Sequence, residues 1–259
     1  MLRKLLFMGC ALLSGCATNP VTGRHQLALV PEEQVISASS QAYSTQMAEY
    51  QKKGELEANS PVVARVRNIA SRIIEQAART RPETAAWKWE VNVIDEPQVN
   101  AFAMAGGKIA VYTGLLEKIS PTDDELAQVM AHEVAHALAG HTREKMSVAM
   151  STDLALAAYG ATQAANEKTQ QALAAGALLA IRLPNSRKME SEADRVGIEL
   201  AAKAGYDPNA AVSLWRKMAQ AGNSGGPEFL STHPSDERRL QTLAELAPQM
   251  MPIYKTARR

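Results

Sequence analysis

His132-Glu133-Val134-Ala135-His136 is the stretch from which the rest of this sequence can be interpreted. The residues on both sides are good helix formers, and on a helix two residues four positions apart lie on the same face. His132 and His136 can therefore direct their imidazole rings to one point, which suits a zinc ion. Glu133 lies about 100° around the helix from His132. A general base that takes a proton from a zinc-bound water needs this position.

The same five letters would also describe a helix with two solvated histidines. Zinc is favoured because the surroundings offer further ligands. His141 is one candidate, but on a continuous straight helix it lies about 900° from His132, half a turn away from the pair. We therefore expect His141 behind the ligands or at the surface.

A better third ligand lies in the segment Met189–Asp194. Glu190 and Asp194 are four positions apart and share a helix face, whereas Glu192 points about 200° away. We predict that Glu190 binds zinc and that Asp194 lies hydrogen-bonded behind a histidine ligand. We expect Glu192 to meet solvent or a neighbouring basic side chain. The alternative is a solvated helix face with three acids.

The first sixteen residues have the pattern of an export signal, in which Arg3 and Lys4 precede an uncharged apolar run too short to span a bilayer. The run ends in Leu13-Ser14-Gly15-Cys16, which resembles the lipobox of bacterial lipoproteins, where the cysteine becomes the first mature residue and carries the lipid. Acylation would account for a lone thiol, since Cys10 is removed with residues 1–15. A plain signal peptide with an incidental cysteine is the alternative. Ala17, in place of an aspartate, favours the outer membrane.

The charges are nearly balanced, with 28 Lys and Arg against 27 Asp and Glu, so nothing in the composition indicates a nucleic-acid partner. Residues 16–30 are expected to form an extended lipidated tether, and residues 31–259 a single metallopeptidase domain. Helices are predicted over residues 31–53, 61–80, 187–203, 208–221 and 238–246, with a helical hairpin insertion over about 146–183. Lipid or a partner could contact that hairpin, but a packed core face is the favoured interpretation.

Alternation predicts strands over residues 87–94 and 108–113, which would form a small antiparallel sheet just before the motif helix. An edge strand beside such a helix can pair with an extended peptide through main-chain hydrogen bonds. We assign Gly106 and Gly107 to substrate binding on this basis. An ordinary hairpin turn is compatible with the same residues.

Several motifs together resemble one metallopeptidase family. They are H-E-x-x-H at 132–136, E-x-E-A-D at 190–194, N-A-F-A at 100–103, G-G-K-I-A-V-Y-T-G-L-L at 106–116 and T-H-P-S-D-E-R-R at 232–239. They are similar to the HtpX-type, Oma-type and Ste-type CAAX proteases, and residues 16–23 resemble the lipid-anchored, periplasmic LoiP-type branch. The chain departs from larger relatives in having no multi-span membrane portion and no tetratricopeptide extension. Processing of prenylated proteins is therefore not expected.

The resemblance implies a zincin-like (gluzincin) fold of the α+β class, mainly helical, with a small antiparallel sheet beside the motif helix. It implies one zinc ion per chain, held by His132, His136 and Glu190, with Glu133 as catalytic base and Asp194 behind a ligand. Its other implied site residues place substrate or stabilise the oxyanion, and they are Asn100, His233 and Arg239.

The predicted function is a zinc endopeptidase of the periplasm, attached to the outer membrane through Cys16. By the resemblance its substrates are misfolded or misassembled envelope proteins, and its partners include the outer-membrane assembly machinery or other periplasmic proteases. A non-hydrolytic zinc-containing chaperone or assembly factor is the alternative, but a structural zinc site does not need Glu133. A cell-wall hydrolase with the same metal chemistry is more remote, since a peptide-pairing strand favours protein substrates.

Overall fold

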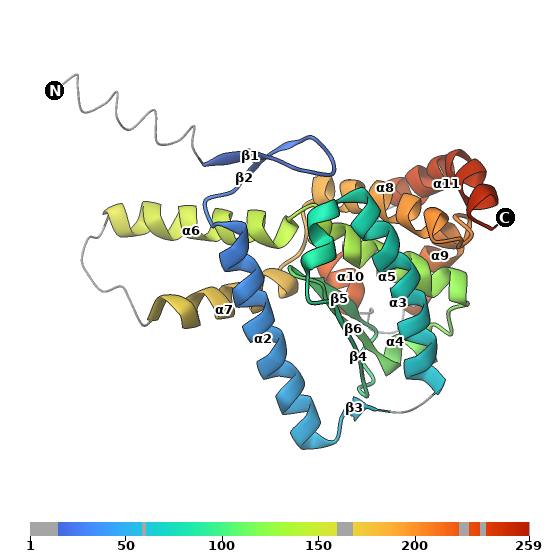
Figure 1. The fold of residues 1–259 in the computed structure, drawn as a ribbon, viewed down its shortest axis with the longest axis horizontal. Helices are drawn as coiled ribbons and strands as arrows, with labels where there is room; N and C mark the ends of the chain where they lie inside the picture. Colours follow the sequence, from blue (N-terminus) through green and yellow to red (C-terminus); the bar gives the residue numbers. More distant parts are fainter. Residues whose placement is uncertain (1–14, 59–60, 160–167, 223–227, 234–236, 259) are drawn as a thin grey trace.

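The computed structural model describes residues 15–58, 61–159, 168–222, 228–233 and 237–258, and Figure 1 shows a mainly helical body around a small sheet. The predicted signal segment lies outside the described residues, apart from Gly15. The helices are α2 (Glu32–Lys53), α3 (Pro61–Thr80), the 3-10 helix η1 (Pro82–Ala86), α4 (Thr113–Lys118), α5 (Asp123–Leu138), α6 (His141–Tyr159), α7 (Lys168–Arg182), α8 (Arg187–Lys203), α9 (Ala210–Gly222), α10 (Glu228–Thr232) and α11 (Glu237–Ala257). This content confirms the predicted α+β, mainly helical fold class.

The main sheet contains β3 (Leu56–Glu57), β4 (Glu90–Ile94), β5 (Ala101–Met104) and β6 (Lys108–Tyr112), in the order β3-β4-β6-β5. The prediction of a purely antiparallel sheet is wrong, because β4 and β6 pair in parallel. The tight turn after β5 makes β5 and β6 antiparallel, and β6 then takes the central place against β4. As a result β5 becomes the edge strand.

Both faces of this sheet are covered, which explains why every residue of β5 and β6 is buried. Alternate side chains of a strand point to opposite faces. Ile109 and Val111 pack into a core with α3, α5, α8, α9 and α11. Phe102 and Tyr112 pack on the other side with α2 and α7. The sheet therefore separates two cores, and its edge strand β5 lies beside the motif helix α5.

The segment after Gly15 forms a hairpin, not the extended tether that the sequence predicted. Strand β1 (Cys16–Thr18) pairs antiparallel with β2 (His25–Leu27). The turn between them is fixed by Asn19, whose side-chain oxygen accepts hydrogen bonds from the backbone N–H groups of Val21 and Thr22. The amide nitrogen of Asn19 donates to the carbonyl oxygen of Ala139 at 2.8 Å, just beyond the end of α5. The hairpin is therefore docked on the catalytic domain.

Helices α6 and α7 lie side by side and extend from the body on the side of the β1–β2 hairpin (Figure 1). They correspond to the predicted helical hairpin, although α6 begins at His141, five residues earlier than expected, and the connection over 160–167 lies outside the described residues. In the described part of the chain, no helix combines the length and the apolar character that a bilayer span requires.

Candidate metal centre

Helix α5 carries the H-E-x-x-H motif, and its side chains are buried from Glu125 to its end. A capping box fixes its first turn. The Glu125 N–H donates to the Thr122 hydroxyl oxygen at 3.2 Å, and the Thr122 N–H donates to the Glu125 carboxylate at 2.9 Å. The rest of the helix then presents His132 and His136 on one face, as their four-residue spacing requires.

Helix α8 supplies the acidic residues of the site and packs against α5 at unusually close range. A Cβ atom on Gly197 would lie 2.9 Å from both the Cα and the N atom of His132, so the absence of a side chain at Gly197 permits this approach. Glu190 and Asp194 lie on the same buried face of α8, where they are 3% and 4% exposed. Close packing of the two helices therefore brings both carboxylates to the motif.

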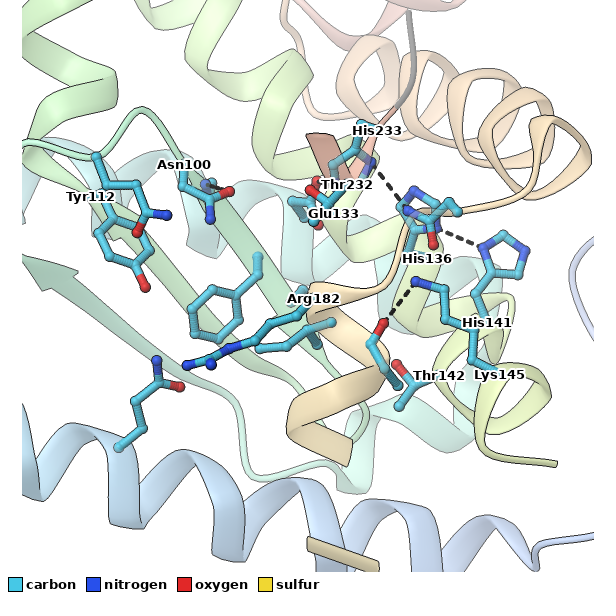
Figure 2. A pocket seen from close by; sticks show the side chains of 18 of the residues that line it. Asn100, Tyr112, Glu133, His136, His141, Thr142, Lys145, Arg182, Thr232 and His233 are labelled. Carbon is cyan, nitrogen blue, oxygen red and sulfur yellow. Dashed lines mark hydrogen bonds and ion pairs between the residues drawn. The ribbon is translucent and has the colours of Figure 1, made fainter. Parts of the chain in front are cut away.

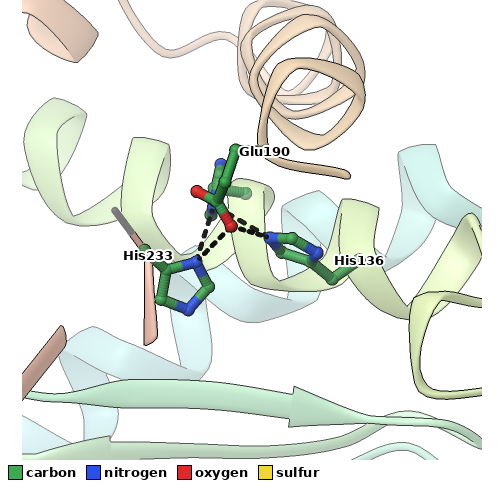
Figure 3. A group of neighbouring side chains, drawn as sticks. His136, Glu190 and His233 are labelled. Carbon is green, nitrogen blue, oxygen red and sulfur yellow. Dashed lines mark hydrogen bonds and ion pairs between the residues drawn. The ribbon is translucent and has the colours of Figure 1, made fainter. Parts of the chain in front are cut away.

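Four side chains gather ligand atoms within 4.8 Å of one another, namely His132, His136, Glu190 and His233. The two Nε2 atoms of His132 and His136 are 3.0 Å apart, and His136 Nε2 is 3.3 Å from Glu190 Oε1. His233 follows α10 and places its Nδ1 atom 3.0 Å from the same Glu190 oxygen. Figure 3 shows the rings of His136 and His233 converging on Glu190.

Asp194 lies directly behind His132. Its Oδ1 atom is 3.1 Å from His132 Nδ1, so the Nδ1–H of the ring can donate to the carboxylate and leave the Nε2 lone pair for a metal. Arg239 holds Asp194 through two hydrogen bonds of 2.7 and 2.8 Å and also forms an ion pair with Glu190. Its guanidinium group stacks on Trp215, 3.7 Å from the ring centroid.

His141 lies behind a candidate metal ligand, which is one of the two positions that the sequence predicted, although it does not lie on a straight continuation of α5. Helix α5 ends at Leu138, and Gly140 adopts a left-handed conformation (φ 66°) that redirects the chain before α6 starts. His141 therefore folds back behind His136, with the two Nδ1 atoms 2.7 Å apart. On its other side His141 Nε2 is 3.1 Å from the carboxylate of Glu192. The glycine after Ala139 was the sequence signal for this break.

Burial and hydrogen bonding set the protonation states at the site. Burial lowers the pKa of His136 well below its usual value, which favours the neutral ring that a metal needs. Burial opposes ionisation of Glu190, but hydrogen bonds from His132, His136 and His233 hold its pKa far below the usual range. For Glu133, burial is the largest influence and raises the pKa, as expected for a carboxylate that exchanges a proton.

Glu133 and His233 lie next to each other in the lining of a cleft with a volume of about 220 Å³ (Figure 2). Glu133 Oε1 is 3.3 Å from His233 Nε2 and has no hydrogen-bond partner within the described part of the chain. Asn100 also lines the cleft, and its side-chain oxygen accepts a hydrogen bond from the Ala101 N–H at 2.9 Å. The edge strand β5 forms one wall.

The structure gives positions for two further sequence-based assignments, which stay predictions. Gly106 and Gly107 do not line the cleft. They form the turn that connects β5 to β6 (φ 82° at each). Arg239 lines a separate cavity between α8 and α11, where Asp194 and Glu190 engage its guanidinium group. Its position suits holding these carboxylates.

The donor set fits a zinc ion. Imidazole nitrogens and one carboxylate oxygen are the ligands that zinc prefers, and ligand atoms of a tetrahedral zinc site are about 3.4 Å apart for bonds near 2.1 Å. Five of the separations between ligand atoms of the four residues lie between 3.0 and 3.5 Å. The bonding of His132 Nδ1 to Asp194 and of His136 Nδ1 to His141 orients both Nε2 lone pairs inward. The same zinc ligands that the sequence predicted thus meet at one point.

Comparison with known proteins gives a consistent family assignment. The model of "Peptidase family M48" matches residues 62–247. The mitochondrial metalloendopeptidase OMA1 of Saccharomyces cerevisiae is 32% identical over 97% of this chain and 75% of its own length. The OMA1 metalloendopeptidase of Homo sapiens is 32% identical over 91% of this chain and 46% of its own length.

A bacterial relative matches a shorter part of the chain. The beta-barrel assembly-enhancing protease of Escherichia coli is 33% identical over 62% of this chain and 35% of its own length. The chain therefore spans less than half the length of the human and E. coli relatives.

Proposed function

The chain belongs to peptidase family M48 and is a zinc-dependent metalloendopeptidase, and on this premise we propose that it degrades misfolded or misassembled proteins of the bacterial cell envelope. The observation that carries the catalytic part is the convergence of His132, His136, Glu190 and His233 with Glu133 beside them. We also propose that Cys16 is lipid-anchored, at the periplasmic face of the outer membrane, as in the LoiP-type branch.

Glu133 carries out the catalytic proton transfers. His132, His136 and Glu190 would hold the zinc ion, which would supply Lewis-acid chemistry for the scissile carbonyl and for a water molecule. Glu133 lines the cleft and can accept the proton of the attacking water, because its Oε1 atom accepts no hydrogen bond from the described residues. The raised pKa of Glu133 then suits return of the proton to the leaving amine.

The edge strand β5 supports the binding of an extended peptide. The Asn100 carbonyl accepts a hydrogen bond from the Tyr112 N–H, so the backbone groups of Asn100 and Phe102 face β6. By strand alternation, those of Ala101 and Ala103 face the open side of the strand. A substrate strand could form main-chain hydrogen bonds with these groups. In the absence of substrate, the Ala101 N–H donates to the side-chain oxygen of Asn100, and a substrate would replace this hydrogen bond.

The catalytic proposal is tested by digestion of unfolded casein by wild type and by Glu133→Gln, with and without a chelator. Wild type should cleave and lose activity in chelator. Glu133→Gln should retain about one zinc ion per chain and lose cleavage, since the ligands remain. Cleavage by Glu133→Gln at the wild-type rate would assign the base to another residue.

Anchoring is supported by the lipobox-like sequence Leu13-Ser14-Gly15-Cys16 and by the exposure of Cys16. Cys16→Ala should move the mature protein from the membrane fraction to the soluble periplasmic fraction. Recovery of this variant wholly in the membrane fraction would refute the anchor.

The substrate class is supported by the E. coli relative, whose name links it to β-barrel assembly. The test compares an unfolded outer-membrane β-barrel protein with the same protein folded in detergent. Cleavage of only the unfolded form is expected, because an extended segment must reach β5. Equal cleavage of both forms, or none of either, would reject this class, and Glu133→Gln controls for contaminating proteases.

A further inference from the structure

We propose that the β1–β2 hairpin is a working part of the metal centre, in which Arg24 positions the zinc ligand His136 through Glu192 and His141. This inference rests on the zinc chemistry of the proposed function. It assigns a positioning role to Arg24, which lies well outside the family-matched residues 62–247. The hairpin is thus more than the connection between a lipid anchor and an enzyme.

The contacts form an unbroken series from the hairpin to the metal ligand. Arg24 Nε donates to Glu192 Oε1 at 2.5 Å. The other oxygen of Glu192 is 3.1 Å from His141 Nε2, and His141 Nδ1 is 2.7 Å from His136 Nδ1. Each of these residues has a defined partner on both sides.

With a neutral His141, this series admits one consistent arrangement of protons. A carboxylate only accepts, so His141 Nε2 carries the proton that it donates to Glu192. A neutral His141 then presents an Nδ1 lone pair, and His136 Nδ1–H donates to it. His136 is left with an inward-facing Nε2 lone pair, the form that a zinc ligand requires.

The other histidine ligand, His132, is supported in a similar way. His132 is backed by Asp194, and Arg239 holds that carboxylate. His136 is backed by His141, which contacts the carboxylate of Glu192, and Arg24 holds that carboxylate. Both ligating histidines are therefore oriented by an arginine–carboxylate pair. Only the pair of Arg24 and Glu192 includes a residue outside the matched residues 62–247.

Arg24 has a physical reason to be necessary. Its guanidinium group contacts two carboxylates, Glu192 and Glu144, and its side chain is only 12% exposed. Without this cation two poorly solvated negative charges would face each other, and like charges repel strongly in such surroundings. Glu192 would then move away from Glu144, and His141 would lose its fixed orientation.

The position of Arg24 in turn depends on docking of the hairpin. Asn19, 1% exposed, donates to the carbonyl oxygen of Ala139 at the end of α5 and also to the side chain of Gln26. Arg143 of α6 donates to the carbonyl oxygens of Ala28 and Val30 after β2. These buried or half-buried bonds fix the hairpin against the same helix end that carries His136.

The experiment measures metal affinity in the full mature protein without any peptide substrate. Zn²⁺ and Co²⁺ dissociation constants would be obtained by competition with a chelator for Arg24→Ala, Glu192→Gln and Arg24→Lys. The matched control is His25→Ala, an exposed neighbour on the same hairpin. The Co²⁺ absorption spectrum and the melting temperature of the metal-free protein would be recorded for each variant.

Loss of support behind a metal ligand costs about ten- to a hundredfold in affinity. We expect this loss, with an altered Co²⁺ spectrum, for Arg24→Ala and Glu192→Gln, and wild-type values for His25→Ala. Arg24→Lys should recover part of the affinity, because lysine keeps the charge but cannot bridge two carboxylates as a planar fork. The double variant Arg24→Ala/Glu192→Gln should lose no more than the larger single loss, since both act through one series.

Wild-type affinity and spectrum in Arg24→Ala and Glu192→Gln would overturn the proposal. Additive losses in the double variant would also overturn it, because they would indicate independent effects. A purely structural role would instead lower the melting temperature of the metal-free protein and leave the Co²⁺ spectrum of the bound form unchanged. Failure of casein cleavage bears only on the proposed function, since none of these measurements uses a substrate.

Discussion

A Cβ atom on Gly197 would lie 2.9 Å from the Cα of His132, so the two helices that build the metal centre meet backbone to backbone at this point. Such a separation leaves no room for a side chain on α8. The relative placement of Glu190 and the two histidine ligands therefore depends on one glycine that has no chemical role of its own.

Gly197→Ala should weaken zinc binding and lower the melting temperature. Alanine favours a helix over glycine by about 1 kcal/mol, but the new methyl group must push α8 away from rigid backbone. Gly176→Ala in α7 is the control, because a Cβ there meets only the Cε atom of Met146 at 3.8 Å. Zinc titration and thermal unfolding of both variants provide the measurement. An unchanged zinc affinity in Gly197→Ala would contradict the packing argument.

Glu190→Gln should produce an inactive protein that is poor in zinc, because it removes the only carboxylate of the ligand cluster. Asp194→Asn should bind zinc about ten- to a hundredfold more weakly and still fill at high zinc, since it changes a group behind a ligand. Elemental analysis with casein cleavage distinguishes the two variants. Full zinc content in Glu190→Gln would move the third ligand elsewhere.

His233→Ala should weaken zinc binding roughly tenfold or more without abolishing it. His233 Nδ1 lies among the ligand atoms, but His132, His136 and Glu190 remain when it is lost. Chelator competition measures this effect separately from turnover. If the affinity is unchanged while kcat falls, the ring acts through its contact with Glu133 and on the reaction alone.

Zinc affinity should fall as the pH is lowered. Burial lowers the pKa of His132, but hydrogen bonds to Asp194 and Glu190 outweigh burial and raise it to about 9. His132 is therefore protonated near pH 7 in the metal-free protein, and an incoming ion must displace that proton. Apparent affinity should increase with pH up to about 9.

Calorimetric titration in buffers of different ionisation enthalpy counts the released protons. Near pH 7 we expect about one proton per zinc ion bound. Asp194→Asn should reduce that number, because the neutral amide no longer raises the pKa of His132. Binding without proton release, and with no dependence on pH between 6 and 9, would contradict this prediction.

The sequence predicted the helices that carry the site with considerable accuracy. The helices over 61–80 and 187–203 have the bounds that were expected, because start signals such as the N-cap Ser186 precede segments with apolar periodicity. The last helix was expected to end near 246 but continues through Pro248 and Pro252 to Ala257. Those prolines indicated an end that the structure does not have.

The surroundings of Glu192 show a limit of predictions that are made from the position of a residue on a helix. Its position on the far side of α8 from Glu190 predicted solvent or a basic neighbour, and Arg24 is such a neighbour, but the contact with His141 was not predicted. The structure places it against Arg24 and His141, with its side chain 14% exposed. A helical projection shows which way a side chain points but not what arrives there from another element.

By itself, the sequence determined the chemistry of this protein: a zinc-binding motif on a helix, a carboxylate base beside it and a third ligand on a second helix. These features follow from spacing within single helices, which local backbone geometry fixes. Tertiary structure alone decided the rest. The left-handed turn at Gly140 sends His141 behind His136, β5 becomes the edge strand because β6 pairs with β4, and residues 16–27 fold onto the end of α5. The last two outcomes depend on contacts between residues far apart in the chain, which no local pattern encodes, whereas the first depends on the left-handed turn at Gly140 and on where α6 then packs.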